Sequence, residues 1–207
     1  MHRQIRSMIA VLTGDIVSSR TRPQRIWLPQ LKGILSQYGT EGKNWEVYRG
    51  DSFQIAVKAN LALQLAFHIK AGIRQKPGLD VRIGIGLGKQ SSKIVKITEA
   101  SGEAFVKSGQ CFDGLKKQNL AILSGETDLD RSLNVMFSLA LRTMNEWSVA
   151  VSKVIVQNLE NPGKSQLEIA KKMKKSQSTV SEALKRGGFD EVMQMEIYFQ
   201  QQIGRLS

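Results

Sequence analysis

The sequence is short of several residue types, and each shortage narrows what the protein is. Its 207 residues include one cysteine, Cys111, so no disulfide can form within the chain, and we expect a reducing, cytoplasmic location. The two histidines stand alone in the sequence and favour no metal site. No apolar run approaches the roughly 18 residues that a membrane-spanning helix requires, and the run at 8–12 is too short for a signal peptide. We therefore expect no membrane contact.

Acidic residues are outnumbered by basic ones. The chain holds 30 lysines and arginines against 18 aspartates and glutamates, a formal net charge of +12. Lysine and arginine neutralise phosphate charge, so this balance favours an anionic partner such as nucleic acid. The charge is spread along the chain, although residues 164–186 alone carry seven basic residues and two glutamates. Composition therefore supports a nucleic-acid partner without locating its site.

The segment 164–186 has the pattern of two short helices joined by a tight turn. Apolar residues recur at helical spacing in each half, which predicts an inner face on both helices. Ser176 is well placed to cap the second helix, because its hydroxyl can accept a hydrogen bond from an unpaired backbone N–H. The apolar positions are Ile169, Ala170 and Met173 in the first half and Val180, Ala183 and Leu184 in the second.

The polar face of the second helix indicates the partner. The segment resembles the helix-turn-helix of bacterial regulators, although lysines stand at the turn, where glycine and an aliphatic residue are usual. Gln, Ser and Lys can reach base edges or phosphates in a major groove, so we expect double-stranded DNA as a partner. The alternative is a helical hairpin with a solvated basic face. The candidate DNA-binding residues are Lys174, Lys175, Ser176, Gln177, Ser178, Thr179, Ser181 and Lys185.

The rest of the chain divides at Ser124-Gly125. Before this point, strand and helix signals alternate in the order β-α-β-β-α-β-α-β, which predicts an α+β sandwich with antiparallel hairpins. After it, apolar residues at helical spacing predict long helices, which we expect to pair two copies of the chain in a homodimer. We predict three segments: an α+β domain at 1–125, linker helices at 126–160 and the DNA-binding domain at 161–207. Within them, strands are predicted at 8–16, 45–48, 52–57, 81–87 and 119–123, and helices at 23–38, 103–117 and 149–159, with further helices capped by Asn60 and Asp190.

Two aspartates stand where strands end. Asp15 follows the first predicted strand, and Asp51 lies at the tip of the predicted hairpin turn. Because the first strand should lie beside that hairpin, the two carboxylates would converge, and Mg²⁺ is the kind of hard cation that would neutralise them. Arg20 and Arg49 are candidate ligands for phosphate oxygens. The alternative is that both aspartates merely hydrogen-bond within their own turns.

Around these aspartates the sequence resembles the class III nucleotidyl cyclases, in Asp15-Ile16-Val17 and in Gly50-Asp51-Ser52-Phe53. The similarity is closer to the SatD family of small bacterial proteins, whose three motif blocks are present at 13–20, 49–54 and 102–109. This resemblance implies a ferredoxin-like, cyclase-like sandwich followed by an all-α helix-turn-helix domain. It also implies a metal at Asp15 and Asp51, with nucleotide contacts from Ile16, Val17, Ser18, Ser19, Arg20 and Arg49.

The departures from the cyclase pattern bear on activity. Val106 and Gln110 stand where cyclases carry an asparagine and an arginine that stabilise the transition state. Loss of a cation facing the transferring phosphate costs orders of magnitude in rate. We therefore expect a regulator whose degenerate cyclase-like domain senses a nucleotide or a partner. The alternative is a divergent metal-dependent nucleotidyl cyclase or phosphoryl-transfer enzyme regulated by its C-terminal domain, and a third possibility is a protein-interaction module.

Overall fold

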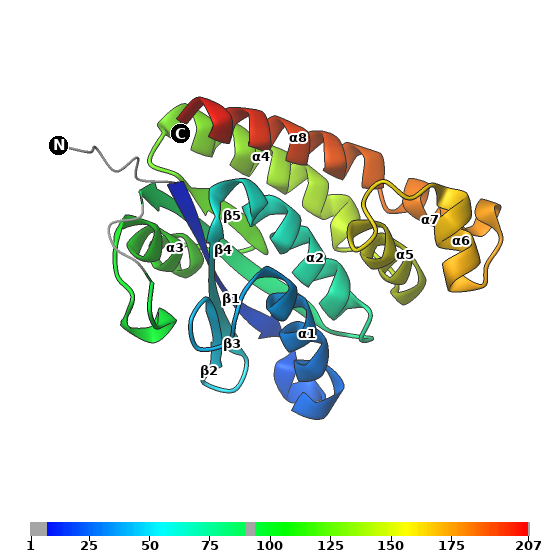
Figure 1. The fold of residues 1–207 in the computed structure, drawn as a ribbon, viewed down its shortest axis with the longest axis horizontal. Coiled ribbons are helices and arrows are strands. Elements are labelled where there is room, and N and C mark those ends of the chain that lie inside the picture. The colour runs from blue at the N-terminus through cyan, green and yellow to red at the C-terminus, as the bar shows by residue number, and fades with distance from the viewer. Residues whose placement is uncertain (1–7, 90–93, 207) are drawn as a thin grey trace.

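The computed structural model describes residues 8–89 and 94–206, and in this part of the chain it shows a mixed α+β fold (Figure 1). Its sheet has the strand order β2-β3-β1-β4-β5, and all neighbours are antiparallel except β4 and β5. The α+β class predicted from the sequence is thus confirmed. The strands are β1 (Met8–Val17), β2 (Trp45–Tyr48), β3 (Ser52–Lys58), β4 (Asp80–Lys89) and β5 (Leu120–Leu123).

The described residues form eight α-helices, of which α6 and α7 lie away from the sheet (Figure 1). α1, α2 and α4 contribute buried residues to the main apolar core on one face, whereas α3 packs against the other face. None of the helices within 8–89 and 94–206 is both long enough and apolar enough to cross a bilayer. The helices are α1 (Leu28–Tyr38), α2 (Ala62–Arg74), α3 (Glu103–Asp113), α4 (Thr127–Met144), α5 (Val149–Leu159), α6 (Gln166–Met173), α7 (Gln177–Arg186) and α8 (Phe189–Leu206).

The order of elements up to β5 is the one predicted, but several boundaries differ. The helix predicted from residue 23 begins only at Leu28, because a short 3₁₀ helix occupies Gln24–Ile26. The prediction that Asn60 caps a helix is wrong, since Asn60 lies inside the 3₁₀ helix Ala59–Leu61. Asp190 lies in the first turn of α8 rather than before it. At α1 and α2 the error falls at the helix start, where a 3₁₀ turn precedes the α-helix, and the helix predicted at 103–117 ends at Asp113.

α3 lies unusually close to β4. Gly84 and Gly86 of β4 face it, and a Cβ atom added at Gly86 would lie 2.2 Å from the backbone nitrogen of Ser108. A Cβ at Gly84 would lie 2.5 Å from the backbone nitrogen of Phe112. Only glycine permits this approach, because any other residue would push the helix off the strand.

The main apolar core is continuous from the sheet into the C-terminal helices. Leu12 of β1, Phe137 of α4 and Phe199 of α8 are all fully buried members of it. α4 also covers the exposed edge of β5, where the Asn134 side chain exchanges two hydrogen bonds with the backbone of Ile122, at 3.0 and 2.9 Å. Pairing of an edge strand in this way removes a template for unwanted strand addition. The sheet and the helical segment, which comprises α4 to α8 (residues 127–206), are therefore packed as one unit along α4.

Candidate functional site

α6 and α7 form a short helical pair whose ends are set by specific hydrogen bonds. The Ser165 hydroxyl and the Glu168 carboxylate form a capping box at the start of α6. At the start of α7, the Ser176 hydroxyl accepts a hydrogen bond from the backbone N–H of Thr179, so its predicted role as a cap is confirmed. Between the helices, Lys174 adopts a left-handed conformation with φ of 53°, and the Lys175 N–H bonds to the Ala170 carbonyl. A lysine thus occupies a conformation that glycine adopts more easily.

The predicted apolar positions of the pair are buried except Met173, which is half-buried. Ile169 and Val180 are fully buried, and Ala170 lies between the two helices with 1% of its surface exposed. α7 also packs against α5 and α8. A larger side chain at position 170 would separate α6 from α7 and disturb the whole group.

The opposite face of α7 and the turn before it are exposed. Among the described residues, Lys174, Lys175 and Lys185 take part in no ion pair, so their charges are free to meet an anion. The Ser176 hydroxyl is occupied by its capping contacts, which include the hydroxyls of Ser178 and Thr179. All eight predicted DNA-binding residues are exposed: Lys174, Lys175, Ser176, Gln177, Ser178, Thr179, Ser181 and Lys185.

The second candidate region lies at the end of the sheet where β1 finishes. Asp15 is paired in register with both Ser52 of β3 and Arg82 of β4, and the Ile16 N–H bonds to the Asp51 carbonyl at 3.2 Å. This pairing brings Asp15 and Asp51 to the same edge, as the sequence predicts. Sequence reasoning missed Arg82, although its alternation with glycine in a predicted strand marked it as a charged residue among small neighbours.

Arg82 holds Asp15 with two hydrogen bonds. Its Nε donates to Oδ1 of Asp15 at 2.9 Å, and its Nη2 donates to Oδ2. Hydrogen bonding to Asp15, together with the nearby charge of Asp51, raises the pKa of Arg82 above its ordinary value. The guanidinium also lies over the ring of Phe112, at 5.4 Å from the centroid.

A Mg²⁺ ion at the two aspartates would have to compete with Arg82. Both oxygens of Asp15 already accept from Arg82, whose positive charge would repel a cation. The Asp51 carboxylate accepts a hydrogen bond from the Ser19 hydroxyl. In residues 8–89 and 94–206, no group of three or more His, Cys, Asp or Glu side chains gathers as metal ligands would.

The predicted nucleotide contacts surround this edge. Ile16 is 3% exposed, so its side chain belongs to the core and only its backbone could meet a ligand. Ser18 is left-handed with φ of 62°, and the Gln24 amide donates to the Gly50 carbonyl at 2.6 Å, which joins the loop after β1 to the hairpin. Arg20 and Arg49 are exposed. The region therefore offers a basic rim rather than an open acidic site.

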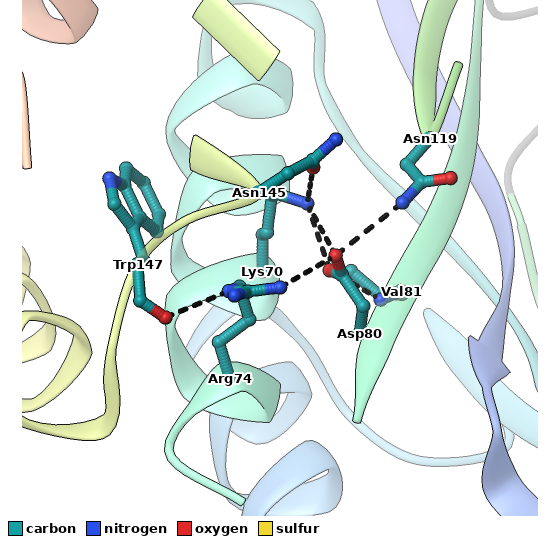
Figure 2. A network of polar contacts seen from close by, with 7 residues as sticks. All are labelled: Lys70, Arg74, Asp80, Val81, Asn119, Asn145 and Trp147. Atoms are coloured by element: carbon teal, nitrogen blue, oxygen red, sulfur yellow. Dashed lines mark hydrogen bonds and ion pairs between the residues drawn. The ribbon is translucent and has the colours of Figure 1, made fainter. Parts of the chain in front are cut away.

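A buried polar cluster joins the sheet to the helical segment, and sequence reasoning missed it (Figure 2). The Lys70 ammonium, on a side chain 3% exposed, donates to both oxygens of Asp80 at 2.8 and 3.0 Å and to Oδ1 of Asn145 at 2.8 Å. Arg74 donates to Asp80 and to the Trp147 carbonyl, both at 3.0 Å. Burial lowers the pKa of Lys70, and the Asp80 charge partly offsets this. The sequence signal that could have revealed this cluster is Lys70 itself, a lysine among the apolar residues of α2.

Comparison with known proteins neither supports nor contradicts the motif resemblance. No protein-family model matches this chain, and no curated protein matches it. The likeness to cyclases and to the SatD family thus remains a prediction based on three short motif blocks.

Proposed function

We propose that this chain is a DNA-binding transcriptional regulator, with α6 and α7 as its helix-turn-helix and the sheet domain as a sensor of a nucleotide or a partner. The observation that carries the proposal is the surface of α7, which buries Val180, Ala183 and Leu184 and exposes polar residues on its other side. A helix capped at its N-terminus and exposed along one face matches the way recognition helices enter a major groove.

Six of the eight exposed residues have a direct role in this proposal. Gln177, Ser178 and Ser181 lie in the first turns of α7 and would meet base edges, since the N-terminal part of a recognition helix makes those contacts. Lys174 and Lys175 in the turn, with Lys185 further along α7, would meet phosphates. Base contacts would set sequence preference, and phosphate contacts would set most of the affinity.

Replacement of Lys174, Lys175 and Lys185 by alanine should weaken duplex binding about equally for all sequences. The slope of log affinity against log salt should become shallower by up to about 2.7, at about 0.9 per phosphate contact. The control replaces three exposed lysines far from α7 in sequence, Lys43, Lys58 and Lys116, and removes the same net charge. Fluorescence anisotropy of labelled duplexes would measure both variants.

Two results would contradict the proposal. Wild-type protein that binds no duplex at low salt would exclude DNA as the partner. Equal loss of binding in the two triple variants would show that net charge, and not α7, attracts the DNA. In contrast, Gln177→Ala should change the preferred sequence with little change in the salt slope.

The sensing role rests on the loop after β1 and the Arg49–Asp51 turn. Arg20 and Arg49 are exposed in this loop and turn, and they favour an anionic ligand. Binding of Mg²⁺ by Asp15 and Asp51 would require Arg82 to move away. Calorimetry with a nucleoside triphosphate, with and without Mg²⁺, separates these possibilities. Metal-dependent binding that Asp51→Asn abolishes would support the two-aspartate site, and rapid turnover to a cyclic product would favour the enzyme alternative. Absence of triphosphate binding would leave partner sensing as the role of the domain.

A homodimer would present two recognition helices to DNA. α4 and α8 frame an apolar groove of about 730 Å³, lined among others by Met136, Ala140, Met195 and Tyr198. Val135 and Leu139 of α4 are 55% and 64% exposed, and a second copy of the chain that covers the groove would bury them. Light scattering should therefore show a mass above 23.1 kDa, and Leu139→Ser should lower it. A 23.1 kDa species alone at micromolar wild-type protein would exclude the dimer.

A further inference from the structure

The carboxyl end of α7 is held by a tryptophan. The indole N–H of Trp147, a residue 2% exposed, donates to the Gly187 carbonyl at 2.7 Å. Gly187 is the C-cap of α7 and lies against α5, where an added Cβ would be 3.0 Å from Ile155 and from Val151. Carbonyls at the end of a helix lack partners within the helix, and a buried one without a partner is costly. Trp147 therefore fixes where α7 ends.

Trp147 is itself tied to the sheet. Its backbone carbonyl accepts from Nε of Arg74, and Nη1 of the same guanidinium donates to Asp80, the first residue of β4. Figure 2 shows Arg74 between Asp80 and the Trp147 carbonyl. A guanidinium presents several donors in one rigid plane, so it holds its two partners in a fixed relation.

The other end of this series of contacts lies at the candidate sensing edge, which is the end of the sheet where Asp15 and Asp51 meet. Asp80 is the register partner of Val17 in β1, directly before the loop that begins at Ser18. Arg82, which holds Asp15, stands two residues further along β4. A path of hydrogen bonds thus runs from the end of β1 and the start of β4 through Arg74 and Trp147 to the end of α7.

We propose that Arg74 and Trp147 are positioning residues that set the orientation of α7 and couple it to the sensing edge of the sheet. The inference rests on the proposed DNA-binding function, because the orientation of α7 matters only if α7 reads DNA. Both residues lie away from the exposed face of α7, so they act through Gly187 and not by contact with DNA.

Two of the three tryptophans in the chain, Trp45 and Trp147, provide a matched test. Trp45 is 1% exposed, and its indole N–H donates to the Gly39 carbonyl at 3.0 Å, a contact confined to the sheet domain. Trp45→Phe and Trp147→Phe therefore remove the same group at similar burial and should lower the melting temperature comparably. Only Trp147→Phe should weaken duplex binding, by about fivefold or more, the lower range for coupled sites. Arg74→Met should do the same and covers the case in which Trp147→Phe fails to fold.

Hydrogen exchange supplies a readout that needs no DNA. Trp147→Phe should speed exchange at the last turn of α7, where the Gly187 N–H bonds to the Ala183 carbonyl, and Trp45→Phe should not. If Trp45→Phe and Trp147→Phe behave alike in exchange and in binding, the coupling does not exist. If wild-type protein binds no duplex, the proposed function fails, and exchange alone then decides whether Trp147 positions α7.

Discussion

Two aspartates at one end of the sheet are paired with arginines, yet their surroundings differ. Asp15 and Arg82 form a two-point pair whose side chains are 20% and 38% exposed. Asp80 is 12% exposed at its side chain and meets both Arg74 and the almost fully buried Lys70. The first pair lies beside the candidate ligand loop, and the second lies between the sheet and the helical segment.

This difference indicates in which of the two ion pairs a ligand could replace one partner. Water reaches the Asp15–Arg82 pair more readily than the Asp80 cluster, so loss of this pair should cost less than loss of a buried charge. The Asp80 cluster has no such replacement, because removal of one buried charge leaves the others uncompensated. The exposed pair is therefore suited to a binding event, and the buried cluster is suited to holding the two halves of the protein in one geometry.

The largest effect should come from Asp80→Asn. This change leaves the Lys70 ammonium and the Arg74 guanidinium without a negative partner, and loss of one member of a buried pair typically costs about 3–5 kcal/mol. Urea unfolding followed by circular dichroism would measure the free energy of unfolding. A loss below about 1 kcal/mol, the range of exposed pairs, would show that water reaches the cluster and that the comparison is wrong.

His68 should give an intermediate effect that depends on pH. It is 1% exposed, with Nδ1 at 3.3 Å from the Tyr38 hydroxyl and Nε2 at 3.3 Å from the Glu160 carboxylate without good hydrogen-bond alignment. Burial lowers its pKa, and Glu160 only partly opposes this. The unfolded chain therefore takes up a proton first as the pH falls, so stability is full above about pH 6.5 and declines below it, by at most about 1.4 kcal/mol per pH unit.

Comparison with His68→Gln isolates this contribution. The difference in unfolding free energy between wild type and variant should shrink as the pH is lowered from 7.5 to 5. A constant difference across that range would mean that His68 titrates alike in the folded and unfolded chains.

The smallest effect should come from Asp15→Asn, the same substitution as at Asp80. The pair with Arg82 is partly exposed, so its loss should cost less than the about 3–5 kcal/mol expected for a buried pair. Asp51, which also faces Arg82 electrostatically, remains as a counter-charge. Urea unfolding alongside Asp80→Asn gives the contrast directly, and similar losses in the two variants would remove the distinction between an exchangeable pair and a structural one.

Much of the local structure could be predicted from the sequence. The strands at 45–48 and 52–57 and the helical pair at 166–186 follow from short-range patterns, because side chains alternate in strands and recur every three to four residues in helices. Ser176 could be identified as a cap because it precedes an apolar helical pattern. The starts of α1 and α2 could not, since 3₁₀ turns and α-helices share the same residue preferences over one turn.

The sequence by itself determined the classes of the elements, the inner and outer faces of α6 and α7, and the meeting of Asp15 with the hairpin. The first two depend on residues close in the chain, whereas the meeting of Asp15 with the hairpin was expected from the β-α-β-β order of the elements. Only the tertiary structure decided that Arg82 pairs with Asp15, that Lys70 and Arg74 both pair with Asp80, and that Trp147 hydrogen-bonds to Gly187. These partners lie 67, 10, 6 and 40 residues apart. Such contacts depend on how the strands pair and how the helices pack, which no local pattern encodes.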